Sequence, residues 1–310
     1  MSINVTTSAN GEALNELLTP LVLGATTIDR GLMRIVPNQQ NSVALGIFDT
    51  LADKLEAPVD TPILGNDSMS KSEVIVTTGD QMWYDEFNPL RDFQEDWSYF
   101  WSSGRLTDAQ AGLKIKQAIL KTVTESVQNN IDKLIWSGDT ASLDVWLQRM
   151  DGLIKLIEAN LDVNVVTPAG VLTKANIIDV LEAMIDATPD QVLEMQSPKI
   201  IMSHRDKQIY FSAIRDATIS KGINIMEGGV PTFAGIPIIS CGIPKDHLVL
   251  TNATSGADSN LVGATWMWAD TKGVKVERLQ ANSEVWFAKV LFKLGVNIVF
   301  GSQLTYYKPV

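Results

Sequence analysis

The stretch WFAKVLFKLGVNIVF, residues 286–300, follows a strict two-residue pattern in which every even-numbered position from Trp286 to Phe300 is apolar. A period of two over so long a run predicts a single β-strand that buries one face against a core. At a rise of about 3.3 Å per residue this strand would be about 50 Å long. We therefore expect it to cross the whole protein.

A helix of matching length is expected over residues 106–136. Thr107 stands at the N-cap position, Gly138 follows the last turn, and apolar residues recur every three or four positions between them. At 1.5 Å per residue this helix would be about 45 Å long. A compact chain of this size has a radius of gyration of roughly 20 Å. A helix and a strand of these lengths therefore predict an elongated plate.

The other segments differ in character from these two elements. Two apolar runs, residues 43–48 and 73–78, flank a polar middle that contains Pro58 and Pro62, which is typical of a long hairpin. After a turn near residue 168 the pattern changes to short alternating helices and strands. We expect an α+β fold in five parts: an arm over 1–41, a hairpin over 42–82, a plate with the long helix over 83–166, a compact α/β lobe over 167–251 and a β return to the plate over 252–310.

Shorter elements are expected inside these parts. Helical character continues over residues 140–159, where Leu143 and Trp146 belong to the apolar pattern. In the lobe, Thr173 is the expected N-cap of a helix over 174–187, and Ser203 with Asp206 resembles a capping box that opens another helix. Strands are expected at 199–202, 236–239 and 247–250.

Aromatic residues concentrate between positions 83 and 101, where 8 of the chain's 22 lie. They are Trp83, Tyr84, Phe87, Phe93, Trp97, Tyr99, Phe100 and Trp101. One interpretation is a small core beneath a loop. The other is a docking surface for a neighbouring subunit, because Trp and Tyr favour interfaces. The two interpretations are compatible, and both stay open.

Composition limits the classes of function. A formal net charge of −11 argues against a surface that grips nucleic acid, because tight binding needs clustered Lys and Arg. Cys241 is the only cysteine, which excludes an internal disulfide and a thiolate metal cluster. The N-terminus has no signal-peptide pattern, and Lys289 and Lys293 interrupt the most apolar stretch. We therefore expect a protein made in a cytoplasm, without a membrane segment.

The sequence offers no pattern for catalysis, for a cofactor or for a metal. It contains no Gly-rich dinucleotide loop, no Walker A loop and no His-Glu-x-x-His. The two histidines, His204 and His247, lack a nucleophile partner and are expected to be capping or surface residues. Cys241 follows an apolar run and is expected to be a small core residue. We therefore expect a protein that is not an enzyme.

The order of these parts, together with three local strings, resembles the HK97-like capsid proteins of tailed bacteriophages. The strings are IDKLIWSGD at residues 131–139, MDGLIKLI at 150–157 and FAKVLFKLGV at 287–296. In that family the parts are called the N-arm, the E-loop, the P-domain with its spine helix, and the A-domain. The resemblance covers nearly the whole chain and extends to podophages related to the crAss-like group.

The resemblance implies a structural role in a virion. Many copies would form pentamers and hexamers of an icosahedral shell around double-stranded DNA, with portal, scaffold or decoration proteins as further partners. The arm starts directly at Met1, which implies a separate scaffold or another guide to assembly. Lys54 and Lys71 flank the hairpin tip, but the sequence marks no partner Asn or catalytic Glu for a covalent crosslink.

Residues expected to touch between subunits carry long cationic or aromatic side chains, and arginine tolerates burial at an interface better than lysine. They are Arg30, Arg34, Lys54, Lys71, Trp83, Tyr84, Arg91, Trp97 and Trp101. Two alternatives remain open. One is an encapsulin, a nanocompartment shell with the same fold; the other is a soluble acid hydrolase, which would need a pocket with two carboxylates of shifted pKa.

Overall fold

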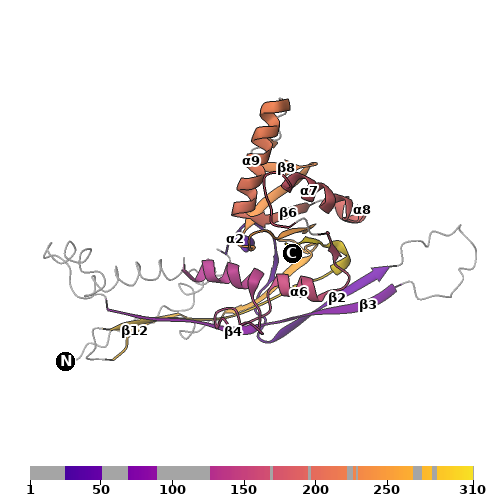
Figure 1. Ribbon diagram of the computed structural model, residues 1–310. Coiled ribbons are helices and arrows are strands. Elements are labelled where there is room, and N and C mark those ends of the chain that lie inside the picture. The colour runs from indigo at the N-terminus through magenta and orange to yellow at the C-terminus, as the bar shows by residue number, and fades with distance from the viewer. Residues whose placement is uncertain are drawn as a thin grey trace, which may run out of the picture.

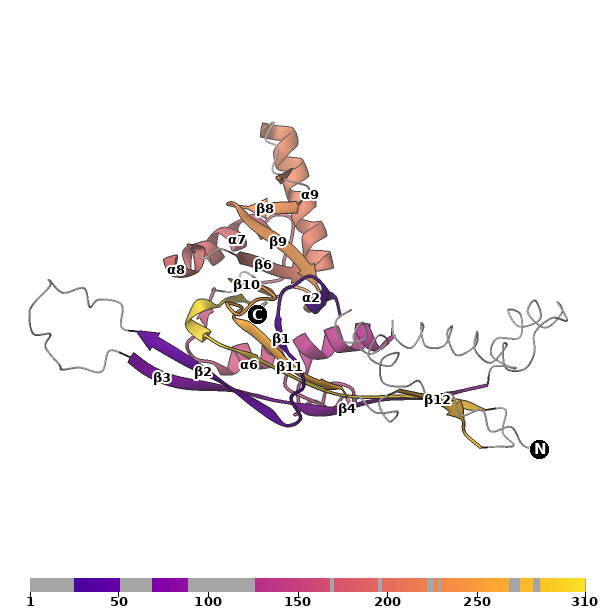
Figure 2. The same cartoon turned by 180° about the vertical axis from the view of Figure 1, so that it is seen from behind.

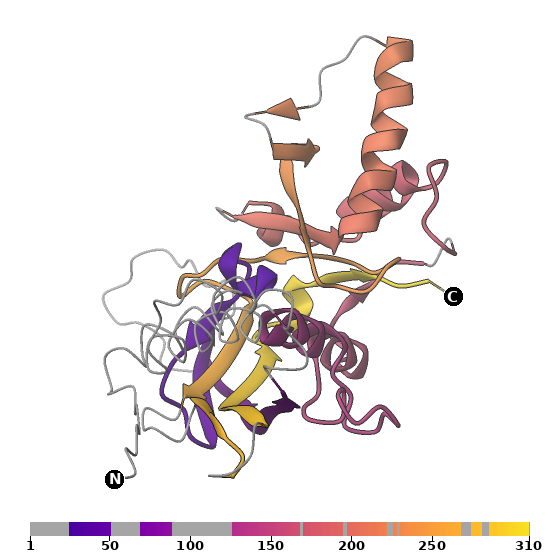
Figure 3. The ribbon, with the colours of Figure 1, turned by 90° about the vertical axis from the view of Figure 1, so that its left-hand side faces the viewer.

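The protein combines an elongated β-plate, a hairpin that extends beyond one end of the plate, and a compact lobe on one face (Figure 1). The view from behind shows the same arrangement (Figure 2). Seen along the plate, the lobe rises from one face of it (Figure 3), and buried residues of the two parts share one core. The computed structural model describes residues 25–50, 69–88, 126–167, 170–194, 197–221, 226–227, 230–267, 274–280 and 285–309.

The plate is built around strand β13 (Trp286–Ile298), as the alternating pattern predicts. Its even-numbered residues from Ala288 onward are buried, and the odd-numbered ones up to Lys293 are half-buried. Strand β4 (Gly79–Phe87) pairs with one side of β13, and β11 (Leu261–Met267) and β12 (Val274–Arg278) pair with the other. A short strand, β1 (Arg34–Val36), adds in parallel to β11.

A helix covers the buried face of the plate. Residues 126–137 are helical, and Val127, Ile131 and Trp136 pack into one core with Val290 and other buried residues of β13. The remainder of the expected long helix, residues 106–125, lies outside the described residues. The apolar residues at helical spacing in residues 126–137 therefore pack on the alternating buried face of β13.

The expected helix over residues 140–159 is only partly correct. Residues 139–152 form a loop, and α6 (Leu153–Ala159) is the only helical part of that range. Gly138 and Gly152 approach each other closely, and the amide of Gly152 donates to the carbonyl of Gly138 at 2.8 Å. Short polar side chains in the loop then hydrogen-bond to nearby backbone, which competes with helix formation.

The hairpin consists of β2 (Ser42–Thr50) and β3 (Met69–Thr77), paired antiparallel from Ser42 opposite Thr77 to Thr50 opposite Met69. Its base packs on the plate through a small cluster in which Val76 meets Val262 and Ala264. Only Thr78 separates β3 from β4, so one extended run passes from the hairpin into the plate. The expected hairpin tip, residues 51–68, lies outside the described residues.

The lobe is a seven-stranded sheet with helices against it. The strand order is β5-β14-β10-β6-β9-β8-β7. The strands are β5 (Asn164–Val165), β6 (Pro198–Ser203), β7 (Met226–Glu227), β8 (Val230–Phe233), β9 (Ile236–Cys241), β10 (Leu248–Asn252) and β14 (Thr305–Tyr307). The helices are α7 (Ile177–Asp186), α8 (Asp190–Leu193) and α9 (His204–Lys221). A second core of buried aliphatic residues fills the space between sheet and helices.

Two details of the lobe differ from the sequence expectation, and one agrees with it. The N-cap of α7 is Asn176 and not Thr173. Strand β14 falls in the range expected to return to the plate, yet it pairs with β10 in the lobe. Ser203 caps α9 as expected, since its hydroxyl accepts a hydrogen bond from the amide of Asp206 at 3.1 Å.

Candidate functional site

Within the described residues, the features suited to contact with other molecules are segments that leave the body, and these segments form the candidate site. The first is the hairpin, whose direction is fixed at its base. The hydroxyl of Thr78 donates to the carbonyl of Asn41 at 2.8 Å, and the side-chain amide of Asn297 donates to the carbonyl of Ile75 at 2.8 Å. Added side chains at Gly79 and Gly295 would meet backbone atoms. The base is therefore a close backbone junction.

Beyond that junction the hairpin has no further strand beside it in the described chain. It forms a sheet of two strands alone, and the pairing continues to Thr50 and Met69. The side chain of Ile75 is exposed on β3. A two-stranded hairpin is marginally stable by itself in water, and open strand edges attract other strands. This part of the chain is therefore suited to lie on another molecule.

The segment before β1 ties the N-terminal side of the chain to the helix and to the lobe. It contains a one-turn helix, α2 (Thr26–Asp29). Asp132 is buried and accepts hydrogen bonds from the amide of Thr27 at 2.9 Å and from its hydroxyl, while the indole of Trp136 donates to that hydroxyl at 2.8 Å. The guanidinium of Arg30 donates to the hydroxyl of Ser240 at 2.8 Å and to the carbonyl of the same residue.

The predicted contact residues are distributed over several parts of the chain. Arg30 lies against the lobe as described, and Arg34 lies on β1 opposite Val262. Lys71 lies on β3 opposite Phe48. Lys54, Arg91, Trp97 and Trp101 lie outside the described residues. The residues of this set that the structure describes do not form one surface, and the role of the whole set between subunits stays a prediction.

Trp83 and Tyr84 are neighbours on β4, and successive strand residues point to opposite faces. Trp83 is half-buried and packs against the core between plate and helix. Tyr84 is exposed on the other face, where it stacks on Phe287 with ring centroids 6.0 Å apart. Its hydroxyl donates to Glu86, and that bond raises the pKa of Tyr84. Of these two residues, Trp83 therefore agrees with the interpretation as a small core, whereas Tyr84 is exposed and could contact a neighbouring subunit.

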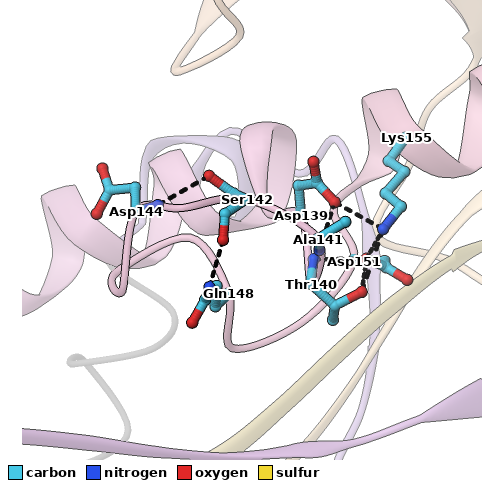
Figure 4. A network of polar contacts seen from close by, with 8 residues as sticks. All are labelled: Asp139, Thr140, Ala141, Ser142, Asp144, Gln148, Asp151 and Lys155. Atoms are coloured by element: carbon cyan, nitrogen blue, oxygen red, sulfur yellow. Dashed lines mark hydrogen bonds and ion pairs between the residues drawn. The ribbon is translucent and has the colours of Figure 1, made fainter.

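A second surface, which the sequence interpretation missed, is the loop of residues 139–151, here called the knob loop. Its base is held by Lys155, whose ammonium lies 2.6 Å from Asp139 and 2.7 Å from Asp151 (Figure 4). The hydrogen bond from Lys155 lowers the pKa of Asp139, and the same bond raises the pKa of Lys155. A sequence signal was present, because Ser142 and Asp144 are residues that initiate turns.

The titratable groups of the lobe serve its internal structure. Asp206 is fully buried and accepts hydrogen bonds from the hydroxyl of Ser203 at 2.7 Å and from the amide of Asp246 at 3.0 Å. Burial raises the pKa of Asp206. His247 shares a 2.6 Å hydrogen bond with the hydroxyl of Tyr306, and burial lowers the pKa of this histidine.

Cys241 is buried, and burial raises the pKa of its thiol to about 12. Within the described stretches, no group of three or more His, Cys, Asp and Glu side chains is placed to hold a metal ion. In the same stretches, no helix has both the length and the apolarity required to cross a bilayer.

Comparison with known proteins shows a likeness in fold but not in sequence. Neither the protein-family models nor the curated proteins contain a match. Among solved structures, the chain is similar to a subunit of the satellite phage P4 procapsid, with a TM-score of 0.58 and 12% identity over 95% of this chain and 90% of that one. It is also similar to the capsid of the empty GTA particle, with a TM-score of 0.55 and 11% identity over 92% and 90%.

A third similar structure is the capsid of Myoviridae phage XM1, with a TM-score of 0.52, 10% identity and 92% coverage of both chains. All three likenesses span nearly the full length of both partners, so they include the plate, the hairpin and the lobe together. The chain therefore has the fold of phage capsid subunits, as the HK97-like order of its segments predicts.

Proposed function

We propose that this chain is the major capsid protein of a tailed bacteriophage, whose copies assemble as pentamers and hexamers into an icosahedral head around double-stranded DNA. The observation that carries the proposal is the hairpin, which leaves the body as two strands with no third strand beside them in the described chain. Ordering such a hairpin in isolation is costly. Laying it over a neighbouring copy would bury its side chains and pair its polar groups.

Three further observations support assembly from identical copies. Closed symmetric shells need the same surfaces repeated on every subunit, and a protruding hairpin with a rigid base supplies such a surface. The capsid subunits to which the chain is similar have matching length and fold. The net charge of −11 suits a container that does not bind tightly to the nucleic acid inside it.

The direct test is to purify the chain, measure its mass by light scattering across a range of concentrations, and image the same sample by negative stain. We expect rings or closed particles tens of nanometres across. A chain that remains monomeric up to millimolar concentration, in a crowding agent as well as in buffer, would contradict the proposal.

A shortened hairpin provides the matched variant. Ile47 and Ser72 are directly opposite each other, so residues 48–71 can be replaced by Asn-Gly, a two-residue turn that suits paired strands. The base cluster around Val76 is retained. We expect this variant to fold with an unchanged lobe and to lose assembly. Assembly at the wild-type concentration would show that the hairpin is not the joint between copies.

The content of particles from infected cells separates the two kinds of shell. Double-stranded DNA inside them would support a phage head, and a protein cargo without DNA would support the encapsulin alternative.

A further inference from the structure

The knob loop exposes apolar side chains to an unusual degree. Leu143 is 97% exposed, Trp146 66% and Val145 59%. Three large apolar residues are thus exposed within four positions of the sequence, whereas single exposed apolar residues are common on any protein. This group therefore requires an explanation that an isolated exposed residue, such as Leu161, does not.

The polar side chains of the same loop hydrogen-bond to its own backbone. The carboxylate of Asp144 accepts from the amide of Trp146 at 3.0 Å, and the hydroxyl of Ser142 accepts from the amide of Asp144 at 3.1 Å. The side-chain amide of Gln148 donates to the carbonyl of Ser142 (Figure 4). These bonds hold the backbone of the loop in one conformation while Leu143, Val145 and Trp146 remain exposed beside them.

The loop is also fixed at both ends. Lys155 joins Asp139 and Asp151, and the hydroxyl of Thr140 donates to Asp151 at 2.8 Å (Figure 4). The amide of Asp139 donates to the carbonyl of Leu147 at 2.9 Å, which closes the loop on itself. A surface that is ordered before binding loses little conformational entropy when a partner docks. Exposed Trp and Leu side chains on such a support have the character of interface anchors.

We infer that the knob loop docks on a second copy of this chain, against the outer face of its plate, and this inference rests on the proposed function. The receiving surface is a strip in which Met82 lies opposite Leu291 and Tyr84 stacks on Phe287. Met82 and Tyr84 are exposed, so the strip presents apolar groups to a partner in the described chain. Charged residues lie among them, because Lys289 is opposite Tyr84 and Glu86 is opposite Phe287. A knob and a separate complementary strip on one chain are the two halves of a head-to-tail contact, the kind that generates rings.

The electrostatics of the knob loop favour an apolar protein partner. Lys155 neutralises part of the charge of Asp139 and Asp151 at its base. The tip presents Leu143, Val145 and Trp146 without a cluster of Lys or Arg, which a phosphate backbone or an anionic lipid surface would require.

A single introduced thiol tests the contact. Cys241 is the only natural cysteine and is buried, so L143C carries the one reactive thiol, and L161C is the control at an equally exposed leucine. We expect maleimide to label L143C at least tenfold more slowly in particles assembled from the purified variant than in unassembled subunits. A benzophenone attached to the introduced thiol of L143C subunits, before assembly, should give covalent dimers mapped to the strip around Met82.

The possible outcomes separate the inference from the proposed function. If particles form and L143C stays as reactive as in subunits, the inference is overturned while the shell function stands. If the purified wild-type chain forms no particle under any condition, both fail. As a second measurement, the double variant L143S/W146S should need at least tenfold more protein than L161S to assemble, with an unchanged unfolding transition. Equal assembly of the two variants would overturn the inference.

Discussion

Gly295→Ala tests whether the hairpin base is as closely packed as the structure indicates. An added Cβ would lie 2.8 Å from the carbonyl carbon of Thr77 and 3.1 Å from the Cα of Thr78, and nearer still to the Thr77 oxygen. Real Cβ atoms essentially never approach a heavy atom within 3.0 Å, and these atoms belong to backbone that cannot turn aside. Overpacking of this kind costs about 1–3 kcal/mol. For a large chain the melting temperature would fall by roughly 2–10 °C.

The measurements are thermal and urea unfolding followed by circular dichroism, with Gly256→Ala as the matched control. A Cβ at Gly256 meets only the hydroxyl of Thr254, at 3.4 Å. Both substitutions reduce the conformational freedom of the unfolded chain to the same extent, so the difference between the unfolding free energies of the two variants measures the effect of the clash at Gly295. Light scattering of the same samples would show whether a displaced hairpin also raises the concentration needed for assembly. A Gly295→Ala protein as stable as the control would refute the close junction.

Three other substitutions test separate features. Asp132→Ala leaves the amide and hydroxyl of Thr27 without their buried acceptor, so it should lower the free energy of unfolding by about 1–3 kcal/mol. An unchanged thermal unfolding transition would contradict the role of this carboxylate. Burial raises the folded-state pKa of Asp206 above 3.8, so the contribution of this carboxyl to stability is present at low pH and is lost as pH rises through that pKa. The unfolding free energy of wild type minus that of Asp206→Asn should therefore fall as pH rises above 3.8, and a pH-independent difference would refute this. Lys155→Met should leave the global unfolding transition nearly unchanged, because both ion pairs of Lys155 are partly exposed. It should nevertheless accelerate proteolysis within residues 139–151, and cleavage at the wild-type rate would show that the loop does not depend on Lys155.

The parts of the fold that sequence could predict are those in which a pattern repeats over many residues. The alternation from Trp286 onward predicted β13 because every second residue of a strand points to the same face, and that face is buried here. The two apolar runs of the hairpin pair as expected, since their spacing leaves room for a connection between them. The capping of α9 by Ser203 was also predictable, because it depends on residues three positions apart.

The knob loop was not predictable from the same pattern. Leu143 and Trp146 stand at helical spacing, and that spacing indicates burial only if the backbone is helical. The loop forms because Ser142 and Asp144 bind their own backbone and because two glycines at its base approach within backbone contact. The place of β14 in the lobe was equally inaccessible, since its pairing with β10 joins distant parts of the chain.

The unbroken passage from β3 through Thr78 into β4 has a mechanical consequence. Tension on the hairpin would travel along the covalent backbone directly into the plate. There β4 is paired with β13 over its full length, from Gly79 opposite Leu294 to Phe87 opposite Trp286. A pull along the strands loads those hydrogen bonds in shear, all together, whereas a perpendicular pull would open them one at a time. The hairpin is thus anchored through β4 to the whole paired length of that strand on β13, and not at a single point.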